Sequence, residues 1–194
     1  MNKPGRDAKD YYRGWMKMSN SSDTDTDNSI VNIIEAVEEF KRRSADDAAV
    51  TFLFLSNLWD NHRYKFKYPD VPFDDWLLQY QRNYTAVVAE ILVRLRPNKD
   101  TLVLQTQHLI RKNHPAATTI NPMNAVVKKI ASFFSVPVFD EDSIMKKYTG
   151  NYSTDYLQDD IHQNIGYSAL LAEHIVAEDW KIVNYCDKGN YITR

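Results

Sequence analysis

Residues Val50–Leu55, with the sequence VTFLFL, form a short and almost continuously apolar run. A run of this length and composition predicts a strand that is buried on both faces, as strands are in a parallel sheet. Two similar runs follow along the chain, Thr101–Thr106 (TLVLQT) and Val136–Phe139 (VPVF). We therefore expect three strands, adjacent or nearly so, in one parallel sheet.

Helical patterns alternate with these predicted strands. The strongest runs over Phe73–Leu95, with apolar residues on one stripe, Asp74 and Asp75 in the first turn, and Arg94 and Arg96 at the end. Further helices are predicted from Ser29 to Phe40, from Asn121-Pro122 to Phe134, and over Ile165–Glu178, whereas Gly150–Gln158 is predicted to be a loop. This alternation predicts an α/β domain whose parallel sheet is covered on both faces.

Composition narrows the class of protein. The 194 residues are 43% hydrophobic and 26% charged, with a net charge of -2. This length and composition predict one domain, over residues 29–180, preceded by a poorly ordered polar segment over 1–28 and followed by a tail over 181–194. The balanced charge argues against nucleic-acid binding, and the single cysteine, Cys186, excludes an internal disulfide. The glycines form neither a Rossmann nor a P-loop motif. We expect no membrane span and no signal peptide in these residues, because no long apolar run is present.

Polar residues follow the predicted strands, at the sheet edge where α/β proteins bind ligands. Ser56 and Asn57 follow the first strand, His108 follows the second, and the acidic group Asp140–Asp142 follows the third. The acidic group is typical of a solvated loop, with Asp140 hydrogen-bonded at the strand end. Mixed oxygen and nitrogen metal ligands are offered by Asp60 and His62 together with His108 or His114, but no Cys partner or helical His pair supports such a site. We expect no metal and no cofactor.

Asp159 stands three residues before His162, just ahead of the last predicted helix. This spacing lets the carboxylate accept the Nδ1 hydrogen of the imidazole while Nε2 faces a cleft, as acyl-transfer catalysis requires. The alternative is a helix-capping aspartate beside an ordinary surface histidine.

Four stretches resemble one family in the right order. DDIHQNIGYSALLAEHI (159–175) resembles the C-terminal block of the SGNH, or GDSL-like, hydrolases. FLFLSNLWDN (52–61), VLQTQHL (103–109) and NPMNAVVKKIASFFSVPVFDEDSIM (121–145) resemble blocks of its PC-esterase-like branch. The resemblance implies a flavodoxin-like, three-layer α/β/α fold. It also implies hydrolysis or transfer of acyl esters, often on glycans and often in secretory proteins, with His162 as the base and Asp159 as its orienting carboxylate.

The sequence departs from this family at the nucleophile. No Gly-Asp-Ser and no recognisable oxyanion glycine block occurs in it, so we expect a fold that is incomplete at its N-terminal side and a chain that is inactive. Ser56 and Asn57 are assigned to the substrate or oxyanion pocket; the alternatives for Ser56 are a substitute nucleophile and a plain strand-end residue. The rival interpretation is a non-catalytic interaction module or decayed copy, self-associating through an exposed sheet edge.

Overall fold

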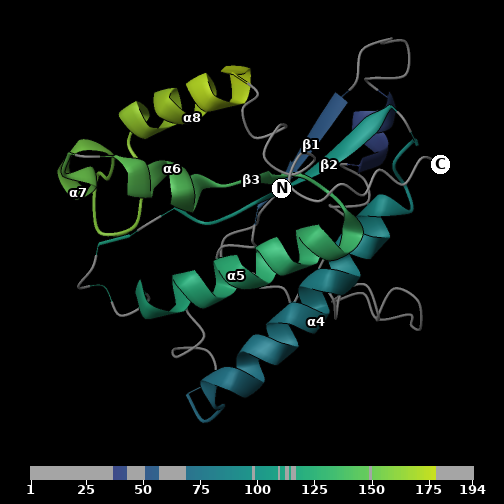
Figure 1. Ribbon diagram of the computed structural model, residues 1–194, viewed down its shortest axis with the longest axis horizontal. Helices are drawn as coiled ribbons and strands as arrows, with labels where there is room; N and C mark the ends of the chain where they lie inside the picture. The colour runs from purple at the N-terminus through teal and green to yellow at the C-terminus, as the bar shows by residue number, and fades with distance from the viewer. Residues whose placement is uncertain are drawn as a thin grey trace, which may run out of the picture. The chain divides into compact units, whose positions relative to one another are not determined.

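The computed structural model describes residues 37–42, 51–56, 69–97, 99–108, 110–111, 114, 117–148 and 150–177. The chain forms two compact units, residues 1–103 and 104–194. The elements with their bounds are β1 (Thr51–Leu55), α4 (Phe73–Leu92), β2 (Asp100–Gln105), α5 (Ala117–Phe134), β3 (Val138–Phe139), α6 (Glu141–Lys147), α7 (Tyr152–Asp155) and α8 (Ile165–Ala177) (Figure 1). No helix in these described ranges is long and apolar enough to cross a membrane.

The three strands form one sheet in the order β1-β2-β3. The end of β2 pairs in parallel with β3, with Leu104 opposite Val138 and Gln105 opposite Phe139. All three predicted strands are present within one or two residues of their predicted bounds. The prediction of an α/β fold with a parallel sheet is thus confirmed.

Helix α4 supplies the aromatic core of the first unit. Its rings form a stacked series from Phe73 through Trp76 and Tyr80 to Tyr84, with successive centroids 5.8, 5.6 and 5.7 Å apart. Trp76, Tyr80 and Tyr84 are buried, and the Tyr84 hydroxyl donates a hydrogen bond to the Ser56 carbonyl at 2.9 Å. The apolar stripe therefore packs toward the end of β1, as the helical period predicts.

An ion pair between Arg96 and Asp100 holds the connection from α4 to β2. The helix ends at Leu92, so Arg94 and Arg96 lie beyond it and not in its last turn, which corrects the predicted bound. The buried Asp100 carboxylate accepts hydrogen bonds from the backbone and the guanidinium of Arg96, at 2.6 to 2.9 Å. A bidentate pair of this kind fixes direction as well as distance, so the chain enters β2 in one orientation.

Helix α5, in the second unit, begins earlier than predicted. It starts at Ala117, which leaves Pro122 inside the helix and not at its first position. Ala117 and Ile120 pack against Ile110 and Ile161, and this burial outweighs the Asn121-Pro122 start signal. The helix ends at Phe134, the next residue Ser135 has φ 55°, and the Val136 N–H donates to the Ala131 carbonyl at 3.0 Å. This is the Schellman arrangement that closes many helices.

The acidic group after β3 is a helix and not a solvated loop. Asp140 caps α6 by accepting from the Ser143 N–H at 3.2 Å, and its hydrogen bond from Thr106 at 3.0 Å matches the predicted strand-end contact. Glu141 and Asp142 are only 3% and 4% exposed, which overturns the prediction of solvated carboxylates. The predicted loop over Gly150–Gln158 likewise contains the short helix α7. Within this unit α5 and α8 lie on opposite sides of β3 and α6 (Figure 1).

Candidate active site

A tight turn carries the predicted Asp-x-x-His pair. Leu157 and Gln163 form an antiparallel bridge, and the Gln158 N–H donates to the His162 carbonyl at 2.9 Å. The chain between them must reverse direction, which places Asp159 and His162 side by side. Both side chains remain accessible, at 52% and 64% exposure.

The Asp159 carboxylate uses its two oxygens for different partners. Oδ1 accepts the backbone N–H groups of Ile161 at 2.8 Å and His162 at 2.6 Å, while Oδ2 lies 2.6 Å from His162 Nδ1. These bonds, led by the His162 and Ile161 N–H groups and followed by the imidazole, hold the pKa of Asp159 well below its ordinary value. The aspartate therefore caps the turn and orients the ring at the same time, two roles that are alternatives when only the spacing of the residues is known.

This geometry sets the tautomer of His162. Because Oδ2 of an ionised carboxylate only accepts, Nδ1 carries the hydrogen and the lone pair of the neutral ring is at Nε2. Such a ring can take a proton at Nε2 while the carboxylate stabilises the resulting imidazolium. The neighbouring Asp160 is engaged elsewhere, since its carboxylate lies 2.8 Å from Arg111 Nη1.

Three buried side chains, those of His108, Glu141 and Tyr167, lie beneath the turn. His108, after β2, bonds through Nε2 to the Ile161 carbonyl at 2.9 Å, and Gln163 Nε2 lies 3.0 Å from His108 Nδ1. Glu141 accepts hydrogen bonds from Tyr167 at 2.6 Å, from Gln163 at 3.4 Å and from Gln105. Burial raises the pKa of Glu141 to about 7, although the bonds from Tyr167 and Gln105 oppose it.

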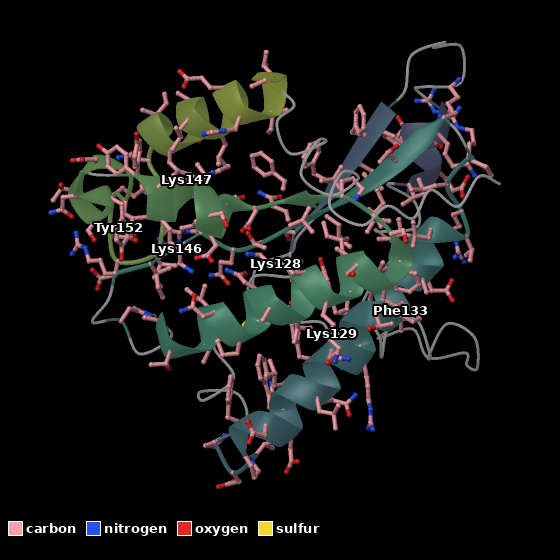
Figure 2. The ribbon with its side chains drawn as sticks, in the orientation of Figure 1. Lys128, Lys129, Phe133, Lys146, Lys147 and Tyr152 are labelled. Atoms are coloured by element: carbon pink, nitrogen blue, oxygen red, sulfur yellow. The ribbon has the colours of Figure 1, made fainter. Side chains whose placement is uncertain are left out.

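The carboxylates on either side of Glu141 are paired with lysines. Lys128 of α5 lies 2.6 Å from Asp140, and Lys146 of α6 lies 2.6 Å from Asp142 (Figure 2). Burial by itself would raise the pKa of Asp140, but the hydrogen bonds from Lys128 and Ser143 outweigh it and lower that pKa. Glu141 has neither lysine and is bonded to uncharged donors instead.

The loop that enters this region is fixed by an amide clamp. Asn124 of α5 accepts the Gln107 N–H at 2.8 Å and donates to the Gln107 carbonyl at 2.9 Å. Tyr152 of α7 donates to the Ile110 carbonyl at 2.7 Å (Figure 2). Two helices thus hold the backbone on either side of His108.

The other predicted site residues are placed as follows. Ser56 follows β1, is half-buried, and accepts the Tyr84 hydroxyl at its carbonyl. Asn57, Asp60 and His62 lie outside the described residues. Within the described ranges no three His, Cys, Asp or Glu side chains gather as metal ligands would. Proximity of His162 to Ser56 remains a prediction.

Sequence reasoning missed Glu141, Gln163 and Tyr167. A usable signal for the first was Asp140, because aspartate is a preferred helix-capping residue and predicts a helix start instead of a loop. Nothing in the sequence marks the other two, because their partners lie 22 to 55 residues away along the chain.

Comparison with known proteins gives a structural likeness. No family model and no curated protein matches the sequence. The structure is similar to Axe2, an acetylxylan esterase from Geobacillus stearothermophilus, with a TM-score of 0.52 and 17% identity over 74% of this chain and 68% of Axe2. The acetyl xylan esterase AlAXEase matches with a TM-score of 0.49 and 16% identity, over 73% of this chain and 75% of that chain.

Axe2 has the SGNH-hydrolase fold, so the chain contains part of an SGNH-like fold. The chain spans about two thirds of the length of Axe2, from 66% to 68%.

Proposed function

We propose that Asp159 and His162 form the proton-transfer half of an acyl-ester hydrolase or acyltransferase site of the SGNH type. The observation that carries this proposal is the 2.6 Å contact between Asp159 Oδ2 and His162 Nδ1, in a turn that leaves His162 exposed within an SGNH-like fold. We infer acylated glycans as the substrate class, because Axe2 is an acetylxylan esterase and the PC-esterase-like branch that the sequence resembles often acts on glycans.

The pair acts as a base and then as an acid. His162 Nε2 takes the proton of a hydroxyl group as its oxygen bonds to the acyl carbon, and the imidazolium rests against the Asp159 carboxylate. The same proton then passes to the leaving alkoxide as the ester C–O bond breaks. Water, or an acceptor hydroxyl in a transferase, repeats these two steps and releases the acyl group.

The nucleophile is the missing part of this scheme. The sequence contains no Gly-Asp-Ser, and Ser56 is the serine that follows a predicted buried strand. Loss of a triad member leaves roughly 10³–10⁴-fold acceleration over water from the oxyanion hole and binding alone. No recognisable oxyanion glycine block occurs in the sequence either, so most of this residual acceleration should also be lost. We therefore propose that the 194-residue chain by itself does not hydrolyse short acyl esters above background.

The experiment is a hydrolysis assay with nitrophenyl acetate on the purified chain and on two variants, His162→Ala and His174→Ala. The second is a matched control, because it removes a histidine of α8 outside the turn that carries Asp159 and His162 (residues 157–163, the dyad turn). We expect background rates from all three. Hydrolysis that is lost only in His162→Ala would show that an internal serine serves as nucleophile, and Ser56→Ala would then test the first candidate.

The alternative function is a non-catalytic interaction module, which self-associates through a sheet edge. The observation that favours it is the absence of the Gly-Asp-Ser motif from the sequence given. The nucleotide sequence upstream of Met1 separates the two proposals. An apolar strand ending in Gly-Asp-Ser, in frame with Met1, supports the enzyme, and its absence supports the module.

A further inference from the structure

A buried polar group underlies the dyad turn and has no place in the chemistry proposed above. It consists of His108, Glu141 and Tyr167, which are at most 3% exposed, together with the half-buried Gln163. Buried polar groups are costly unless their hydrogen bonds are satisfied. Their hydrogen bonds connect them to the dyad turn.

The ring of His108 contacts the residues on both sides of His162. Nε2 lies 2.9 Å from the carbonyl oxygen of Ile161, and Nδ1 lies 3.0 Å from the amide nitrogen of Gln163. His162 stands between these two residues and turns its own side chain outward, where it is 64% exposed. Residues 161 to 163 thus face toward His108, away from it and toward it again, as successive residues do in a short extended segment.

The direction of each hydrogen bond follows from its partners. A carbonyl oxygen only accepts, so His108 Nε2 donates to Ile161 and Nδ1 is left as an acceptor for the Gln163 amide. The Gln163 nitrogen also lies 3.4 Å from Glu141 Oε2, which in turn accepts the Tyr167 hydroxyl at 2.6 Å. Glu141 therefore sets which end of the Gln163 amide faces His108.

We propose that His108 is a positioning residue for the Asp159–His162 pair, holding Ile161 and Gln163 so that the His162 backbone keeps the angle at which its N–H and ring both reach Asp159. Glu141 and Tyr167 complete this function by orienting the Gln163 amide. The inference rests on the proposed function for its purpose and on the contacts above for its geometry. It gives His108 a role different from the metal ligation considered in the sequence analysis.

Three substitutions separate the contributions of His108. His108→Phe keeps an aromatic ring beside Tyr167, whose centroid lies 5.5 Å away, but removes both hydrogen bonds. His108→Gln restores a donor near the position of Nε2, and His108→Asn restores an acceptor near the position of Nδ1. Gln163→Leu tests the same link from the turn and leaves the core intact should His108→Phe fail to fold.

The readout is hydrogen exchange of the Ile161 and His162 amides by NMR, compared with the Ile130 amide in α5. Both turn amides bond to Asp159 Oδ1, so their protection reports the geometry of the pair. We expect His108→Phe and Gln163→Leu to speed their exchange about tenfold relative to Ile130. His108→Gln should recover part of the protection at Ile161.

Two results would overturn the proposal. One is unchanged exchange at Ile161 and His162 in folded His108→Phe and Gln163→Leu. The other is equal acceleration at Ile130, which would make His108 an ordinary core residue. Because ester hydrolysis is not the readout, failure of the proposed function and failure of this inference are seen in separate experiments.

Discussion

Asp159 holds His162 in one tautomer because its two oxygens have separate partners. In Asp159→Asn the side-chain oxygen is needed by the Ile161 and His162 N–H groups, so the NH₂ group faces His162 Nδ1. We expect the ring hydrogen to move to Nε2, which leaves no base on the exposed side. Imidazole ¹⁵N chemical shifts measure this change directly.

The matched control is Asp160→Asn. This neighbouring carboxylate pairs with Arg111 and not with the ring, so the ¹⁵N shifts of His162 should stay as they are in the unaltered protein. If Asp159→Asn leaves the ring in the Nδ1–H form, the carboxylate does not set the tautomer. In active serine triads the wrong tautomer lowers kcat by about 10⁴-fold.

At the scale of the element, α5 holds the loop after β2 through one amide. Asn124→Ala removes two hydrogen bonds from the buried Gln107 backbone, and we expect the free energy of unfolding to fall by about 2–4 kcal/mol. Denaturant titration measures the loss. Asn121→Ala, exposed on the same helix, should change stability by no more than about 0.5 kcal/mol, and equal losses in the two variants would contradict the clamp.

The end of α5 carries a small conformational strain. Ser135 has φ 55°, a left-handed conformation that a Cβ atom disfavours and glycine adopts freely. Ser135→Gly should raise the melting temperature, in step with a gain of about 0.5–1 kcal/mol, because relief of about 1–2 kcal/mol of left-handed strain is partly offset by the larger entropy that glycine loses on folding. Ser132→Gly lies inside the helix and should lower stability by about 0.5 kcal/mol. A loss in both variants would mean that the helix ends differently.

Local patterns predicted what depends on local contacts. The partners of the Asp159–His162 hydrogen bond are three residues apart in the sequence. The apolar strand runs and the apolar stripe of α4 can likewise be recognised from the spacing of nearby residues. Their outcomes therefore match the structure within a few residues. The start of α5 was wrong because Ile120 packs against Ile110 and Ile161, a contact that no local signal carries.

Glu141 is the clearest case of a site residue that the sequence hides. Three consecutive acidic residues are typical of a solvent-exposed loop. Gln105 and Tyr167, 36 and 26 residues away, nevertheless provide the hydrogen-bond donors that allow Glu141 to be buried. Only the packing of β2, α6 and α8 brings those donors together. The acidic composition of this stretch alone predicts exposed carboxylates.

At the scale of the whole molecule, Glu141 makes stability depend on pH. Burial raises its pKa from 4.5 to about 7, so the folded protein binds the proton more tightly than the unfolded chain. The stabilisation is complete below about pH 4.5 and is lost as the pH rises through 7. We expect the unfolding free energy to contain a fall of about 3 kcal/mol over this window.

Urea titrations between pH 4.5 and 8 test this expectation. Glu141→Gln keeps an acceptor for Gln105 and cannot ionise, so its profile should lack the fall. Glu173→Gln, an exposed position on α8, is the control and should keep the fall of the unaltered protein. Parallel profiles for the unaltered protein and Glu141→Gln would show that Glu141 does not titrate in this range.

The double duty of the Asp159 carboxylate has an evolutionary consequence. Because one side chain shapes the turn and orients the ring, selection for a folded turn preserves the aspartate even when no reaction is under selection. The imidazole partner has no such protection, since its ring is exposed and its N–H belongs to the backbone. In related sequences where the histidine serves no reaction, it should therefore be substituted first, and the aspartate should remain as the lasting trace of the paired turn.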